Sequence, residues 1–129
     1  MNIFLTGATG FIGRNLARRL SSEGHRVRCL VRIPGRASWM KDCPGLEILP
    51  GDLADERALL SGVEGADLVV HLAACTSAVR EKTYFDVNGR ATGKLASLVA
   101  RGGHPQVRMI YLSSLSVAGP RTGARPARE

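Results

Sequence analysis

Three glycines near the start of the chain come directly after a short apolar run. Gly7, Gly10 and Gly13 come after Asn2–Leu5, in the segment MNIFLTGATGFIG. Glycine allows a tight turn and a close approach of the backbone to phosphate oxygens, because it has no Cβ and tolerates positive φ. The amides of a helical turn next to it would then point at the anion. The segment predicts a site for a dinucleotide pyrophosphate, although the spacing is GxxGxxG and not GxGxxG, so the interpretation depends on the residues at the other strand ends.

An arginine follows the second expected strand. Proteins that bind NAD usually place Asp or Glu about 20 residues beyond the glycine turn, for the ribose hydroxyls. Here the residue is Arg32, with Arg36 close behind. A guanidinium can bind a 2′-phosphate through charge-assisted hydrogen bonds, whereas an acid would repel it. The pair favours NADP over NAD, which stays the second choice. The alternative is that Arg32 is a solvated arginine at a strand end.

Two further strand ends carry residues that suit the rest of a dinucleotide. The Asp52 carboxylate could accept a hydrogen bond from the exocyclic amine of adenine, while Leu53 packs on the ring. Alternatively, Asp52 belongs to a helix N-terminal turn and competes with Asp55 as the cap. Ala73 and Ala74 follow the next strand and are small enough to let the backbone approach the middle of the cofactor.

Paired serines follow the last expected strand. The hydroxyls of Ser113 and Ser114 could hold a substrate oxygen beside the expected nicotinamide. Serines at strand ends also satisfy backbone groups, which is the alternative interpretation. His71 precedes Leu72, Ala73 and Ala74, and we expect it to be a buried core histidine and not a catalytic one.

Apolar strands alternate with amphipathic helices along the chain, which predicts a parallel α/β sheet. We expect strands at about 2–6, 26–32, 46–50, 67–72 and 107–113. Helices are expected over Phe11–Glu23 with Gly24 as the C-cap, from the cap Asp55 through Leu60, and within Lys82–Arg101 before Gly102 and Gly103. Pro34–Pro44 is predicted to be a loop with a brief helical turn. Ligands of such sheets lie at the carboxyl ends of the strands, where the candidate residues fall.

The chain has 129 residues, about the length of one domain. From Gly119 onward it has almost no apolar residues, so we expect a domain over residues 1–118 and a flexible tail over 119–129. No run of about 18 apolar residues is present, which predicts no membrane span. The start has no basic n-region, so we expect no signal peptide and a cytoplasmic location.

The formal net charge is +7, from 18 Lys and Arg against 11 acids, which could indicate a nucleic-acid partner. The arginines are dispersed, however, and no aromatic stacking platform accompanies them. We therefore expect no nucleic-acid partner, and we assign part of the charge to a basic pocket for a phosphorylated cofactor. Cys29, Cys43 and Cys75 lack CxxC spacing and predict neither a disulfide framework nor a metal site.

Five motifs occur in order along the chain: TGATGFIG, GDL, HLAA, the helix pattern FDVN and SSLSVAGP. In this order they resemble the extended short-chain dehydrogenase/reductase superfamily. More narrowly, the chain is similar to its NAD(P)-dependent epimerase/dehydratase group, which includes dihydroflavonol-reductase-like proteins. The resemblance covers essentially the whole chain. It implies a Rossmann-type, doubly wound parallel sheet, of which we expect a truncated domain with about five strands in the order 3-2-1-4-5.

The spacing and the resemblance together indicate the cofactor-binding residues Gly7, Ala8, Thr9, Gly10, Phe11, Ile12, Gly13, Arg32, Arg36, Asp52, Leu53, Ala73, Ala74, Asn88 and Ser113. The resemblance also implies that Ser114 helps to orient the substrate. Family members carry a YxxxK pair well beyond this serine, in which the lysine lowers the pKa of the tyrosine that acts as general acid/base. The chain ends at Glu129, before such a pair, so we expect these 129 residues to bind cofactor without turnover.

The resemblance implies that the parent enzyme transfers a hydride between NADP(H) and a carbonyl or hydroxyl carbon of a small-molecule substrate. Reductase, dehydrogenase, epimerase and dehydratase activities all stay open. The first alternative is a non-catalytic dinucleotide-binding or regulatory module, and a basic nucleic-acid-binding domain is the less favoured one. A sheet that stops at its fifth strand exposes an edge and apolar faces, so we also expect self-association.

Overall fold

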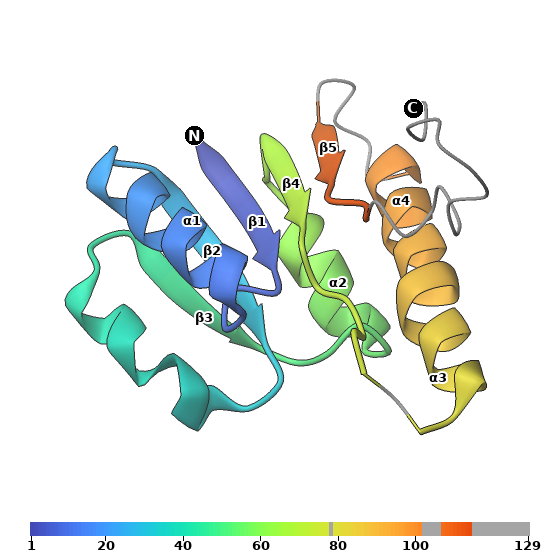
Figure 1. The fold of residues 1–129 in the computed structure, drawn as a ribbon. Coiled ribbons are helices and arrows are strands. Elements are labelled where there is room, and N and C mark those ends of the chain that lie inside the picture. Colours follow the sequence, from blue (N-terminus) through green and yellow to red (C-terminus); the bar gives the residue numbers. More distant parts are fainter. Residues whose placement is uncertain (78, 102–106, 115–129) are drawn as a thin grey trace, which may run out of the picture.

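The computed structural model describes residues 1–77, 79–101 and 107–114. A five-stranded sheet forms its centre, in the order β3-β2-β1-β4-β5 (Figure 1). The strands are β1 (Asn2–Thr6), β2 (Arg26–Val31), β3 (Leu46–Pro50), β4 (Leu68–His71) and β5 (Arg108–Tyr111). Every neighbouring pair is parallel, and in the centre Leu5 of β1 lies opposite Cys29 of β2 and Val70 of β4. The predicted sheet and its strand order are confirmed.

Helices cover both faces of this sheet (Figure 1). They are α1 (Phe11–Ser22), the 3-10 helix η1 (Pro34–Asp42), α2 (Glu56–Val63), α3 (Glu81–Tyr84), the π-helical η2 (Phe85–Ala91) and α4 (Thr92–Arg101). The last three follow one another without a break, as the expected helix within Lys82–Arg101 requires. The expected glycine stop at 102 and 103 lies outside the described residues, as do the tail at 119–129 and the proposed domain boundary at 118.

Two apolar clusters hold the layers together. On one face, Ala17 of α1 and Met40 of η1 pack with Leu5 and Val27 of the sheet. On the other face, Leu59 of α2 and Leu95 of α4 pack around Phe4 and Val69. Successive residues of β1 thus point to opposite faces, as the pleat of a strand requires. Burial on both faces explains why the strands are nearly continuous apolar runs.

The segment after β2 differs from its prediction. Pro34–Asp42 is a nine-residue 3-10 helix, where the sequence predicts a loop with a brief helical turn. Ala37 and Met40 are buried in this segment, and residues three apart lie on the same side of a 3-10 helix. Packing of these two side chains against the sheet therefore stabilises a helix that glycine and proline content alone disfavours.

The caps have the expected chemistry. Asp55 is the N-cap of α2, since its Oδ1 accepts a hydrogen bond from the amide of Ala58 at 3.1 Å. The helix continues to Val63, three residues beyond the expected end at Leu60. The C-cap of α1 is Glu23, one residue before the predicted Gly24. Gly24 follows the cap with a φ of +80°, the left-handed conformation that commonly ends a helix. Within the described ranges, none of the helices is both long and apolar enough to cross a bilayer.

Candidate functional site

The glycine turn between β1 and α1 leaves no room for side chains. Gly7 has a φ of +79°, and a Cβ added there would lie 2.6 Å from the nitrogen of Ala73. A Cβ on Gly13 would collide with the carbonyl oxygen of Gly7. The amide of Gly10, the N-cap of α1, donates to that same carbonyl at 3.0 Å. The turn thus brings bare backbone and a helix N-terminus to one place, as an anion requires.

A groove with a volume of about 610 Å³ opens at the carboxyl ends of the strands. Eight of the predicted cofactor-binding residues line it, namely Gly7, Thr9, Gly10, Arg32, Asp52, Leu53, Ala73 and Ala74. They come from the ends of β1, β2, β3 and β4, which are far apart in sequence. Dinucleotides bind at this edge of parallel α/β sheets, so the geometry brings the main candidates together where the chemistry needs them.

The helical side of the groove was missed by the sequence reasoning. It is formed by Asp86, Val87, Arg90, Ala91 and Lys94 of η2 and α4. Leu30, Gly51, Ala54 and Leu72 complete the lining next to the predicted residues. The spacing of Val87, Ala91 and Lys94 is that of one face of a helix, and this periodicity was the available signal.

Eight predicted residues within the described part of the chain do not line the groove, namely Ala8, Phe11, Ile12, Gly13, Arg36, Asn88, Ser113 and Ser114. Ala8 and Gly13 are buried beneath the turn. Phe11 and Ile12 stand on the first turn of α1 with 88% and 54% of their surface exposed. The four residues thus frame the glycine turn and do not form the groove wall.

The side-chain amide of Asn88 hydrogen-bonds the backbone of Cys75. Its amide oxygen accepts a hydrogen bond from the nitrogen of Cys75 at 2.7 Å, and its amide nitrogen donates to the carbonyl of Cys75 at 2.9 Å. Both ends of the amide are therefore used to fasten the segment after β4 to η2. Arg36 is exposed on η1, and Ser113 and Ser114 are exposed just after β5.

The part of the groove at the ends of β2 and β3 contains one acidic and one basic predicted residue, Asp52 and Arg32. Asp52 Oδ1 accepts hydrogen bonds from the amides of Ala54 at 2.8 Å and Asp55 at 3.2 Å, so it forms the turn before α2 while also facing the groove. Leu53 is half-buried and packs against the apolar cluster of α2 and α4. Arg32 is exposed and makes no ion pair within the described ranges.

The other charges of the groove are paired. Asp86 binds Lys82 at 2.6 Å and Arg90 at 2.7 Å, one helical turn away on either side. The hydrogen bond from Lys82 lowers the pKa of Asp86, and Arg90 adds to the effect. Lys94 Nζ lies 2.8 Å from Glu56 Oε2 and so links α4 to α2, which lowers the pKa of Glu56. The acidic side chains at this wall are therefore carboxylates.

His71 is fully buried, which confirms its expected place in the core. Its Nδ1 lies 2.6 Å from Thr6 Oγ1, and its Nε2 lies 2.9 Å from Thr92 Oγ1. The ring stacks on Tyr111 of β5 with centroids 5.5 Å apart. Burial lowers the pKa of His71 below 6.5, so the imidazole is neutral at neutral pH.

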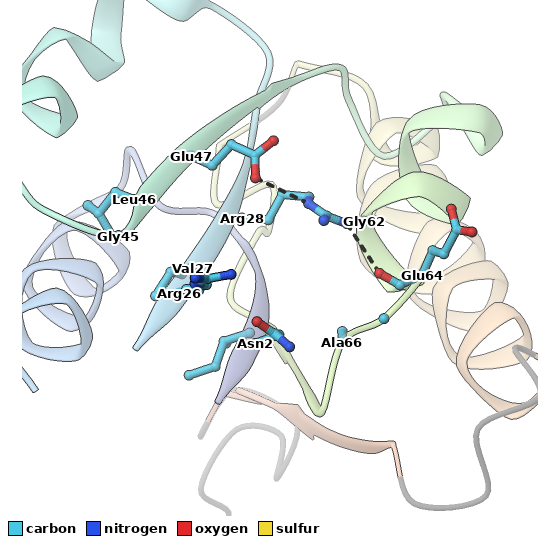
Figure 2. Close-up of a pocket in the computed structure, with 12 residues that line it drawn as sticks. Asn2, Arg26, Val27, Arg28, Gly45, Leu46, Glu47, Gly62, Glu64 and Ala66 are labelled. Atoms are coloured by element: carbon cyan, nitrogen blue, oxygen red, sulfur yellow. Dashed lines mark hydrogen bonds and ion pairs between the residues drawn. The ribbon is translucent and has the colours of Figure 1, made fainter. Parts of the chain in front are cut away.

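A second hollow, of about 430 Å³, lies at the opposite edge of the sheet, where the strands begin (Figure 2). Figure 2 shows Arg28 reaching from Glu47 to Glu64 across it. Arg28 Nη1 donates to the carbonyls of Ser61 and Glu64 at the C-terminus of α2, and its Nε lies 3.6 Å from Glu47 Oε2. A cation at a helix C-terminus is stabilising, so the role of Arg28 is structural.

Residues 1–77, 79–101 and 107–114 include three cysteines, none of them in a disulfide. No group of three or more His, Cys, Asp or Glu side chains there could hold a metal ion. The cysteines are free thiols. Burial raises the pKa of Cys29 to about 12, so this residue behaves as a small apolar side chain of the core.

Comparison with known proteins gives a match to the model of the NAD dependent epimerase/dehydratase family over residues 3–129. The chain is 34% identical over 118 residues to the ceramide reductase of Caulobacter vibrioides, covering 92% of this chain and 36% of that protein. It is 35% identical over 124 residues to the 3 beta-hydroxysteroid dehydrogenase/Delta 5→4-isomerase of Mycobacterium tuberculosis, covering 89% and 32%. The chain thus spans about a third of the length of these relatives.

Among solved structures, a short-chain dehydrogenase/reductase superfamily protein from Agrobacterium tumefaciens with bound NAD has the same fold, with a TM-score of 0.78. The two sequences are 28% identical, and the match covers 92% of this chain and 34% of the other. The five strands therefore correspond to part of a larger Rossmann-like protein.

Proposed function

The chain belongs to the NAD dependent epimerase/dehydratase family, and we propose that it is the cofactor-binding portion of an NAD(P)-dependent oxidoreductase, epimerase or dehydratase. The observation that carries this proposal is the single groove lined by the glycine turn, by Asp52 and Leu53, and by Ala73 and Ala74. These residues offer, in turn, amides for phosphate, a carboxylate for the adenine amine and small side chains for the middle of the cofactor.

We propose NADP as the preferred cofactor. Arg32 lines the groove, and within the described ranges it has no acidic partner to compete with a phosphate. Arg36 does not line the groove, so Arg32 is the first candidate to bind the 2′-phosphate. NAD is the alternative, and the NAD-bound relative from Agrobacterium tumefaciens supports it.

In the whole protein, the bound cofactor would donate or accept a hydride at a carbonyl or hydroxyl carbon of a small molecule. Ser114 would hold the substrate oxygen, and its place shortly after β5, whose last residue Tyr111 pairs with His71 at the end of β4, supports that role. The general acid/base would come from other residues of the protein. Neither tyrosine of the chain has Lys four residues on, since Tyr84 is followed by Asn88 and Tyr111 by Leu115.

Titration of the chain with NADPH and with NADH, monitored by cofactor fluorescence, tests the proposal. We expect both to bind, with NADPH the tighter ligand, and no turnover on a panel of carbonyl substrates. Failure of both cofactors to bind would overturn the proposed function. Robust turnover by the 129 residues would show that catalysis does not need the residues we place elsewhere.

A non-catalytic dinucleotide-binding module is the second candidate. The groove favours it because its predicted residues all serve the cofactor, whereas Ser114 does not line the groove. The reading frame beyond codon 129 separates the two candidates. A YxxxK pair within about one helix and loop of that point indicates an enzyme, and a stop codon indicates the module.

A further inference from the structure

The His71 ring hydrogen-bonds two of the elements that build the groove, β1 and α4, and is linked to the segment after β4 through Thr6. Its Nδ1 lies 2.6 Å from Thr6 Oγ1, at the end of β1, and its Nε2 lies 2.9 Å from Thr92 Oγ1, at the start of α4. Thr6 Oγ1 also accepts a hydrogen bond from the amide of Ala73 at 3.2 Å. One imidazole thus joins the strand before the glycine turn, the segment after β4 and the helical wall.

Each of these contacts lies next to a residue that lines the groove. Thr6 directly precedes Gly7, Ala73 is itself part of the lining, and Thr92 directly follows Ala91. The spacing between these walls is tight, because a Cβ on Gly7 would stand only 2.6 Å from the nitrogen of Ala73. A small shift at the imidazole would therefore change the distance between the phosphate turn and the middle of the groove.

The burial of Thr6 decides the direction of the hydrogen bonds. Thr6 is fully buried, so its hydroxyl proton needs an acceptor within the protein. Its oxygen already accepts from Ala73, and Nδ1 of His71 is the acceptor within reach. His71 is then the tautomer with its proton on Nε2, which donates to Thr92. Burial also lowers the pKa of His71, in keeping with a neutral ring.

We propose that His71 is a positioning residue for the cofactor, which fixes the glycine turn, the Leu72–Ala74 segment and helix α4 at the separation that a dinucleotide needs. This inference rests on the proposed function, because it names a residue that acts on that same groove. If His71 only filled the core, its replacement would lower stability and leave cofactor affinity unchanged in the molecules that remain folded.

Variants at Thr92 test the inference without removing the ring. Thr92→Val deletes the hydroxyl that accepts from Nε2, and Thr92→Ser keeps it. We expect Thr92→Val to weaken NADPH and NADH binding by up to about tenfold, the limit set by one net hydrogen bond, because the helical wall is no longer held in place, and we expect Thr92→Ser to restore it. Val63→Ala is the matched control, because it opens the core at α2, away from the groove lining. It should lower stability and leave affinity unchanged.

Nitrogen NMR of the imidazole provides a second readout that needs no cofactor. We expect Nε2 protonated and Nδ1 unprotonated in the wild-type chain and in Thr92→Ser. A ring protonated on Nδ1 would overturn the proposed arrangement. If the wild-type chain binds cofactor and Thr92→Val and His71→Gln bind it as tightly, this inference fails and the proposed function stands. If the wild-type chain binds neither cofactor, both fail.

Discussion

The backbones of Gly7 and Ala73 are packed so closely that a Cβ placed on Gly7 would lie 2.6 Å from the Ala73 nitrogen. The two residues are at the ends of neighbouring parallel strands, β1 and β4, and both line the groove. A side chain at position 7 would therefore push the glycine turn away from the segment after β4. Position 7 therefore requires glycine for two reasons: the close approach of Ala73 and its own φ of +79°.

Gly7→Ala should therefore lower both stability and cofactor affinity. Gly24→Ala is its matched control, because Gly24 has nearly the same φ, +80°, but nothing within 4 Å of an added Cβ. We expect the control to cost about 1 kcal/mol of unfolding free energy through backbone strain alone, and Gly7→Ala to cost more. Urea unfolding and NADPH titration measure the two effects. Equal losses in both variants would contradict the close packing.

Arg32→Ala should reduce the preference for NADPH. Loss of a charge-assisted hydrogen bond to the 2′-phosphate should weaken NADPH binding by about tenfold or more and leave NADH binding nearly unchanged. Arg19→Ala is the control, since Arg19 lies on α1 and binds Glu23 at 2.6 Å. Parallel titrations with the two cofactors measure the ratio. A ratio that is the same in all three proteins would assign the 2′-phosphate to another group.

The sheet could be predicted from sequence because its strands are apolar runs bounded by turn residues, and their alternation with helices permits few topologies. The site residues at the ends of those strands were predictable for the same reason. Thr9, Asp52 and Ala73 come directly after a strand or within the glycine turn, and the carboxyl ends of parallel strands meet at one edge.

The helical wall was harder to predict, because Val87, Ala91 and Lys94 are ordinary residues whose only signal is their spacing. Asn88 shows a different limit. An asparagine side chain can hydrogen-bond a cofactor or the protein backbone equally well. Only the folded chain reveals that the amide of Asn88 binds both backbone groups of Cys75. Sequence indicated that Asn88 matters, and not what it contacts.

Alanine variants of Asp52 and Asp55 should distinguish a residue that binds the cofactor from one that only caps a helix. Asp55→Ala removes the cap of α2 and should cost about 1 kcal/mol of unfolding free energy, with cofactor affinity unchanged. Asp52→Ala removes the turn contacts to Ala54 and Asp55 and should also weaken cofactor binding, because Asp52 lines the groove. Calorimetry of NADPH binding checks the difference. Unchanged affinity in Asp52→Ala would reduce this residue to a turn former.

Self-association through the edge strand β5 stays a prediction. Ile110 and Tyr111 of β5 and the next residue, Leu112, expose 54%, 46% and 47% of their surface, which leaves exposed apolar side chains at this edge of the sheet. Sedimentation of the chain should therefore show association that increases with concentration. Ile110→Lys should shift it towards the monomer. Val79→Lys, at an exposed position before α3 and away from β5, should not. A monomer at every concentration would contradict the prediction.

Stability should decrease as the pH falls because of His71. Its pKa lies below 6.5 in the folded chain, so as the pH falls through that value the unfolded chain takes up a proton that the folded chain does not. The contribution is complete above pH 6.5 and decreases below it, by at most about 1.4 kcal/mol per pH unit for one proton. Unfolding from about pH 8 to about pH 5 measures the slope, which His71→Gln should flatten. Asp86 and Glu56 act at lower pH, because Lys82 and Lys94 lower the pKa of each carboxyl from values that are already acidic, 3.8 and 4.5. An unchanged slope in His71→Gln would show that the buried imidazole is not the group that titrates.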